Sequence, residues 1–189
     1  SGKRLSIGAL NPAEWGRIAN AASTLTAAPI YLDDTPSVTV QDIKARVRRI
    51  PNVSVVFIDY LQLMHSANRT ENRVQEVSEV TRSLKIMAKE LHIPVVVCAQ
   101  LTRGSEKARR PSLPDLRESG SIEQDADQVM FIYREEMRAD QEEDVSKISF
   151  GTGELIVAKN RHGETGTVNL SFEGEFTQFK SKPKEISQD

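Results

Sequence analysis

An apolar run that ends in one carboxylate constrains the fold of this chain most. Residues 53–58 read Val-Ser-Val-Val-Phe-Ile, and Asp59 follows them directly. A run of this length, mostly β-branched or aromatic, predicts a buried central strand of a parallel sheet. Parallel sheets bind ligands at the carboxyl ends of their strands, where Asp59 is expected. An acid there can order Mg²⁺ beside a nucleotide phosphate, although an aspartate that only caps a loop or the next helix gives the same pattern.

A second apolar strand is predicted at residues 95–99, and it ends at Gln100. Between the two strands, apolar residues recur at helical intervals over about five turns. They are Val74, Val77, Val80, Leu84, Met87 and Leu91. A strand, a helix and a strand joined by short loops predict a right-handed parallel crossover, so Asp59 and Gln100 should share one rim of the sheet. The Gln100 amide can both donate and accept, which suits sensing a phosphate or orienting a water, although an ordinary strand-end glutamine looks the same.

The remainder of the chain predicts more helices and a final run of antiparallel strands. Asn11-Pro12-Ala13-Glu14 opens a helix that Ala28-Pro29 ends, and a second helix begins near Thr39. Strands are expected at residues 30–32, at 128–133, and as a meander at 154–159, 167–172 and 176–179. Residues 134–146 read as an acidic, mobile connector. The predicted fold class is α/β: a mostly parallel sheet flanked by helices, followed by an antiparallel meander.

Composition narrows the function classes. The chain has 189 residues, of which 38% are hydrophobic and 28% charged, and no apolar run reaches the roughly 20 residues of a membrane helix. Its net charge of −2 excludes a generally basic nucleic-acid coat, but local phosphate contacts stay open. The one cysteine, Cys98, lies in the second apolar strand and is expected to be a small buried hydrophobe. The three histidines show no metal-ligand spacing, so no metal site made only of protein ligands is expected.

The chain lacks the loop that usually holds nucleotide phosphates in sheets of this kind. No G-x-x-x-x-G-K-[ST] stretch occurs, and the glycine-containing residues 151–154 and 163–166 lack both its spacing and its lysine. The start Ser1-Gly2, without methionine, fits either an added leader or a cut in a longer protein. Residues 1–180 are therefore interpreted as the C-terminal part of a nucleotide-binding domain whose phosphate loop lies upstream, and residues 181–189 as a disordered tail.

Several stretches together resemble the RecA-type motor domain of bacterial DnaB-type replicative helicases. They are residues 57–63 (FIDYLQL), 71–78 (ENRVQEVS), 99–103 (AQLTR), 115–127 (DLRESGSIEQDAD), 158–161 (AKNR) and 163–166 (GETG). The match runs in order from about residue 11 to residue 179. The string at 117–127 is very specific, because a generic RecA-like ATPase shares the strand pattern and Asp59 but not this string.

The resemblance implies a RecA-like fold, a partial P-loop NTPase domain, with residue roles taken over by position. Asp59 matches the Walker B acid that holds Mg²⁺, usually through water. Gln100 matches the γ-phosphate sensor that links nucleotide state to the DNA-facing loops. Arg161 matches the arginine finger that reaches the γ-phosphate bound by the neighbouring subunit, and Lys159 matches the basic residue beside it. From spacing alone, without the resemblance, Arg161 reads as an exposed basic hairpin tip.

The resemblance also implies DNA contacts. Arg117, Glu118 and Gly120 match the loop that holds single-stranded DNA in the centre of the family's ring. Arginine supplies positive charge and glycine lets the backbone N–H approach a phosphate, whereas Glu118 can contact phosphate only through its main chain. A further loop with Arg69 and Arg73 is another candidate for DNA contact. Without the resemblance, residues 117–127 read as a surface loop leading into a capped helix.

The implied cofactors are ATP and Mg²⁺, and the implied partners are single-stranded DNA, five further copies of the parent in a homo-hexamer, primase and a helicase loader. The resemblance implies 5′→3′ translocation and a bacterial cytoplasmic location at the nucleoid or replisome, with no membrane partner. The family's phosphate loop, water-activating glutamate and amino-terminal collar have no counterpart here, so the chain alone is expected to be inactive. Two alternatives remain: another RecA-fold ATPase of recombinase or clock type, and a non-catalytic module that assembles with, loads or regulates a helicase.

Overall fold

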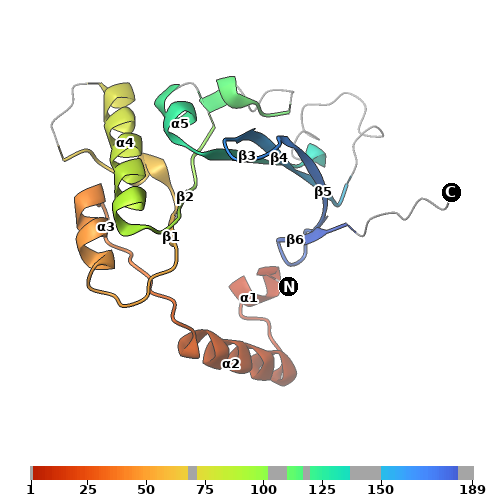
Figure 1. The fold of residues 1–189 in the computed structure, drawn as a ribbon. Helices are drawn as coiled ribbons and strands as arrows, with labels where there is room; N and C mark the ends of the chain where they lie inside the picture. The colour runs from red at the N-terminus through yellow and green to blue at the C-terminus, as the bar shows by residue number, and fades with distance from the viewer. Residues whose placement is uncertain (1, 68–71, 102–109, 117–119, 137–149, 183–189) are drawn as a thin grey trace.

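The computed structural model describes residues 2–67, 72–101, 110–116, 120–136 and 150–182. Two separate sheets make up this structure, and helices lie on one side of the first (Figure 1). The helical elements are α1 (Gly2–Ser6), α2 (Pro12–Ala27), α3 (Val40–Val47), α4 (Arg73–Leu91) and α5 (Gly120–Asp125), with 3₁₀ turns at Leu61–Leu63 and Leu113–Leu116. The strands are β1 (Val56–Ile58), β2 (Val95–Val97), β3 (Gln128–Tyr133), β4 (Thr152–Asn160), β5 (Gly166–Glu173) and β6 (Gln178–Ser181).

The predicted crossover is confirmed. β1 and β2 pair in parallel, with Ile58 opposite Val97, and α4 connects them. The Asn72 side chain caps the start of α4 by accepting the Val74 N–H at 2.9 Å. α4 ends at Leu91, and the backbone of the capping residue His92 takes the left-handed conformation at φ 55°. These local signals fix where the helix begins and ends between the two strands.

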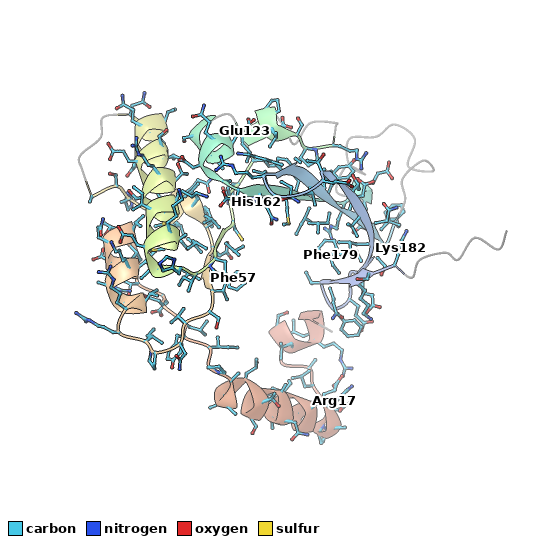
Figure 2. All side chains as sticks on the ribbon, in the orientation of Figure 1. Arg17, Phe57, Glu123, His162, Phe179 and Lys182 are labelled. Atoms are coloured by element: carbon cyan, nitrogen blue, oxygen red, sulfur yellow. The ribbon has the colours of Figure 1, made fainter. Side chains whose placement is uncertain are left out.

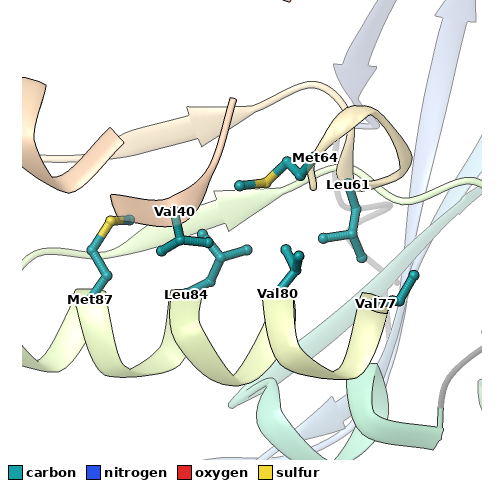
Figure 3. Packing of buried hydrophobic residues seen from close by; sticks show 7 residues of the cluster. All are labelled: Val40, Leu61, Met64, Val77, Val80, Leu84 and Met87. Carbon is teal, nitrogen blue, oxygen red and sulfur yellow. The ribbon is translucent and has the colours of Figure 1, made fainter. Parts of the chain in front are cut away.

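The larger core lies between α3, α4 and the turn after β1. Seven buried side chains form it, drawn in Figure 3: Val40, Leu61, Met64, Val77, Val80, Leu84 and Met87. Met87 is only 1% exposed. The apolar stripe predicted along α4 therefore supplies four of the seven residues.

The prediction of a buried central strand at residues 53–58 is wrong. Phe57 is 72% exposed, and Val96, its partner in the register, is 44% exposed. Side chains alternate along a strand, so only one face of the β1–β2 pair meets the α4 core, and the described residues leave the other face open. Cys98 continues the alternation of β2 onto the open face and is exposed, which also corrects the expectation of a buried thiol.

Helix α2 forms as predicted, but its apolar side chains have no core to pack against among the described residues. The side chain of Asn11 accepts the Glu14 N–H, and Glu14 in turn accepts the Asn11 N–H, so both capping bonds are present. No residue of α2 is buried, and α2 lies apart from the two sheets in Figure 1. The strand predicted at 30–32 is absent: these residues form an exposed connection, because no neighbouring strand among the described residues pairs with them.

The second sheet confirms the predicted meander. Its order is β3-β4-β5-β6, and every pair is antiparallel. Leu116, Val129 and Phe131 form a second core under this sheet. Phe172 and Phe179 pack with ring centroids 4.8 Å apart. Of the acidic connector expected at 134–146, residues 137–146 lie outside the described part of the chain, as do residues 183–189 of the expected tail.

Candidate functional site

The structure places Asp59 and Gln100 at the same edge of the parallel pair. Beyond Ile58 and Val97 the two segments stay paired, since Cys98 N–H donates to Ile58 O at 2.9 Å and Leu61 N–H donates to Cys98 O at 2.8 Å. Asp59 is exposed, and its carboxylate makes no hydrogen bond or ion pair with any described residue. An exposed acid at this edge fits a Mg²⁺ ion that keeps its waters, because Mg²⁺ is typically held by one or two carboxylates together with substrate phosphates.

Gln62 is a functional candidate that the sequence reasoning missed. Its side-chain Nε2 donates to Gln100 O at 3.2 Å, and Gln100 N–H donates back to Gln62 Oε1 at 3.3 Å. This reciprocal pair holds the Gln100 main chain as a strand neighbour would. No local pattern reveals it, because the two residues lie 38 positions apart in the chain.

Arg73 supports the same edge from the start of α4. Its Nη2 donates to Gln62 O at 2.7 Å, and its Nη1 donates to Glu76 at 2.5 Å. The hydrogen bond from Arg73, with a smaller contribution from His65, holds the pKa of Glu76 below its ordinary value. Arg73 thus has contacts within its own chain, and its assignment to DNA stays a prediction. Arg69 lies outside the described residues.

Lys159 and Arg161 lie together at the end of β4, where both bind the carboxyl end of α5. The Lys159 ammonium donates to the carbonyl oxygens of Glu123 and Ala126, the latter at 2.8 Å. Arg161 Nη2 donates to Gln124 O at 3.3 Å. Figure 2 labels Glu123 on α5 and His162, the residue after Arg161, on neighbouring segments. Cations near the last carbonyls of a helix offset the negative end of its dipole, so both basic residues steady α5.

Asp127 connects Arg161 to the rest of the fold. Its backbone oxygen accepts the Arg161 N–H at 2.9 Å, and its Oδ1 lies 3.3 Å from Arg161 Nη1. Its Oδ2 forms an ion pair with Lys85 of α4. The hydrogen bond from Lys85, with the nearby charges of Lys85, Arg161 and His162, lowers the pKa of Asp127. The side chain of Arg161 is nevertheless 49% exposed, so part of its guanidinium faces solvent.

The turn that carries Arg161 is fixed by Asn160. Asn160 Nδ2 donates to Glu164 O at 3.2 Å, and Asn160 Oδ1 accepts the His162 N–H at 3.3 Å. A Cβ on Gly163 would lie 2.7 Å from Asn160 Nδ2, so a larger residue there would displace the side chain that closes the turn. These bonds close a short, well-defined hairpin tip rather than a loose loop.

Of the predicted DNA loop, only its end is described. Arg117 and Glu118 lie outside the described residues, and Gly120 begins α5. Before the loop, the buried Asp115 accepts hydrogen bonds from Ser112 N–H at 2.7 Å and from its hydroxyl at 2.9 Å. Nothing within 4 Å would meet a Cβ on Gly120, so the described packing gives no reason for glycine there.

Neither a cluster of metal-ligating side chains nor a membrane-spanning helix occurs among the described residues. Within them, no group of three or more His, Cys, Asp and Glu side chains could hold a metal ion. None of their helices is both long and apolar enough to cross a membrane. Asp59 is therefore the described candidate for Mg²⁺, and it needs phosphate oxygens and water to complete the coordination.

The comparisons with known proteins decide the family. The model of the DnaB-like helicase C-terminal domain matches residues 1–181. The chain belongs to this family. The resemblance drawn from the sequence is thus confirmed, and the domain is a homologue of the C-terminal domain of the replicative helicase DnaB. The alternative of a recombinase or clock-type ATPase does not account for a match of this extent.

Curated relatives and solved structures agree. The replicative DNA helicase DnaB of Geobacillus stearothermophilus is 46% identical over 183 residues, covering 94% of this chain and 39% of that protein. The replicative DNA helicase DnaC of Bacillus subtilis is 43% identical over the same coverage. Among solved structures, one described as an ATPase domain superposes with a TM-score of 0.85 at 34% identity, covering 96% of this chain and 65% of that one.

A second solved structure, of a DnaB-like replicative helicase and its interactions with primase, superposes with a TM-score of 0.83. Its sequence is 35% identical, and the match covers 92% of this chain and 43% of that one. The DnaB-like domain thus spans about 40% of the length of the curated relatives it matches.

Proposed function

We propose that this DnaB-like domain is part of an ATP-dependent replicative helicase that translocates on single-stranded DNA and unwinds duplex at the replication fork. The observation that carries the proposal is the shared edge of Asp59 and Gln100 in a domain of this family. The exposed Asp59 carboxylate and the Gln100 side-chain amide, whose main chain is held by Gln62, suit a bound Mg²⁺-nucleotide. Asp59 would order the waters of the metal, and the Gln100 amide would lie near the terminal phosphate.

The open face of the parallel pair supports a phosphate loop supplied by another segment of a longer helicase. Phe57 and Val96 expose apolar surface that parallel sheets normally cover with helices. β2 and β3 each lie at the end of their sheets, so each has a strand edge free among the described residues. A segment that carries the phosphate loop between a strand and a helix would pair its strand with the free strand edges and cover the open apolar face with its helix. The isolated chain should therefore show negligible ATP hydrolysis.

Arg161 would serve a neighbouring subunit in this proposal. A planar guanidinium fixed on a short hairpin suits the charge that develops on a transferring phosphoryl group. Asp59 would contact the nucleotide bound by its own subunit, and Arg161 the nucleotide bound by the neighbouring subunit. The subunits would therefore pack head to tail, and the expected closed form is a homo-hexameric ring. Lys159 would hold α5 in place beside the finger.

The remaining assignments follow the family. Single-stranded DNA would be held in the ring by Arg117, the main chain of Glu118, and Gly120. Primase and a helicase loader are the proposed protein partners, in a bacterial cytoplasm at the replisome. ATP with Mg²⁺ would supply the free energy for movement. The residues of this chain would position the Mg²⁺-nucleotide, sense its terminal phosphate and stabilise the charge on the transferring phosphoryl group.

The test is Arg161→Ala in the full-length hexamer. ATP hydrolysis should fall by about 10³- to 10⁵-fold, as expected for loss of an arginine finger, while nucleotide binding stays largely intact. Lys180→Ala is a matched control, because Lys180 is an exposed cation on β6 paired with Glu173 on β5. Its hydrolysis should equal that of the parent. Loss of nucleotide binding in Arg161→Ala would argue against a finger, and Mg²⁺-dependent turnover by the isolated chain, abolished by Asp59→Asn, would refute the need for another segment.

A further inference from the structure

Asp127 holds Arg161 at two points. One bond joins main chain to main chain, from Arg161 N–H to Asp127 O at 2.9 Å. The other joins the side chains, between Nη1 and Oδ1 at 3.3 Å. The first fixes where the arginine leaves the hairpin, and the second fixes the direction of its side chain. A long side chain held in this way loses less conformational entropy when it meets a ligand.

Lys85 keeps Asp127 from cancelling the charge of Arg161. The Asp127 carboxylate is shared between two cations, one from α4 and one from the β4 hairpin. The group of three therefore carries one net positive charge, and about half of the Arg161 side chain is open to solvent. The lowered pKa of Asp127 keeps its carboxylate ionised across the physiological range. An arginine finger needs this combination of fixed direction and remaining positive charge.

Lys159 does not share this arrangement. Its ammonium is bound to two carbonyl oxygens of the α5 end, and no described carboxylate pairs with it. The two basic residues at the end of β4 thus have different surroundings, and only Arg161 of the two is aimed by a described acid.

We infer that Asp127 is a positioning residue for Arg161, which presents the guanidinium to the nucleotide of the neighbouring subunit. This inference rests on the proposed function of Arg161. Asp127 itself touches no nucleotide in this arrangement; it acts through the two bonds to Arg161 and through Lys85, which ties the group to the rigid helix α4.

The test compares ATP hydrolysis by full-length hexamers that carry Asp127→Asn, Asp127→Glu, Arg161→Ala, or Asp127→Asn with Arg161→Ala. Asp127→Asn should lower kcat by about 10- to 100-fold, the scale expected when a catalytic group is displaced by about 1 Å. KM for ATP should change by less than about twofold, because the subunit's own nucleotide edge is untouched. Asp127→Glu keeps the charge and should recover part of the loss. In the Arg161→Ala background, Asp127→Asn should have no further effect.

Asp125→Asn is the matched control. Asp125 lies at the same end of α5, but its carboxylate accepts the Thr81 hydroxyl at 2.7 Å and no described contact joins it to Arg161. Its kcat should stay within about twofold of the parent. A second readout uses the 189-residue chain itself: ¹⁵N relaxation of the Arg161 guanidinium should show greater motion in Asp127→Asn and unchanged motion in Asp125→Asn.

The outcomes separate this inference from the proposed function. If Arg161→Ala keeps its turnover, the finger and its positioning both fail. If Arg161→Ala loses turnover but Asp127→Asn does not, only the positioning role fails. Higher turnover in Asp127→Asn would mean that Asp127 withholds Arg161, and an equal loss in both backgrounds would mean that it supports the fold; either result overturns the inference. Unchanged guanidinium motion in Asp127→Asn also overturns it.

Discussion

Replacing Phe57 with alanine tests whether one face of the parallel pair is open. Phe57 lies in the middle of β1 and is 72% exposed, so only roughly a quarter of its surface is covered. Truncating a fully buried Phe costs about 3–5 kcal/mol. Scaled to the covered fraction, Phe57→Ala should cost about 1 kcal/mol in this chain. Met87→Ala is the reference, since Met87 is 1% exposed and should lose the full cost of about 2–5 kcal/mol.

The assay is equilibrium urea unfolding of the 189-residue chain, followed by circular dichroism at several protein concentrations. The free energy of unfolding should drop far less for Phe57→Ala than for Met87→Ala, without dependence on concentration. In the full-length helicase, Phe57 should be covered, and Phe57→Ala should then approach the cost of Met87→Ala. A cost for Phe57→Ala in the isolated chain as large as that for Met87→Ala would refute the open face. A cost that grows with protein concentration would show that a second copy covers it.

Two further predictions follow from single contacts. Asp33, bonded to Arg46 and Thr35, should titrate with a pKa of about 2 instead of 3.8 in an NMR pH titration, and Arg46→Gln should return its pKa toward 3.8. Because the folded pKa lies below the unfolded one, the stabilisation by this pair should be complete above pH 3.8 and lost as the pH falls toward 2. Gln62→Ala should speed hydrogen exchange of the Gln100 amide, which donates to Gln62, and leave the Leu61 amide, which donates to Cys98, protected.

The parts of the fold that depend on local chemistry could be predicted from the sequence. The apolar period of α4, its Asn72 cap and the adjacent strands are set by residues near one another in the chain. The meander at β4 to β6 depends on alternation and on a glycine turn, which are also local. The placement of Asp59 and Gln100 at one edge followed from the parallel direction of the two strands, which a helical crossover between them predicts.

Burial and distant pairing could not be predicted in the same way. Phe57 and Cys98 are exposed because strand burial depends on what covers the sheet, and the described residues cover one face. The Gln62–Gln100 and Asp127–Arg161 bonds join segments far apart in sequence, and neither leaves a periodic signal. The residues that hold the candidate site were therefore visible only in the structure.

Helix α4 joins the two parts of the candidate site. Arg73, its first residue, donates to Gln62 O, and Gln62 holds the main chain of Gln100. Twelve residues further along the same helix, at about 18 Å for a rise of 1.5 Å per residue, Lys85 pairs with Asp127. An α-helix resists stretching, since its length is fixed by its backbone hydrogen bonds. While both contacts hold, the Gln100 edge and Arg161 therefore move together with α4, and movement of one relative to the other requires that one of these contacts breaks.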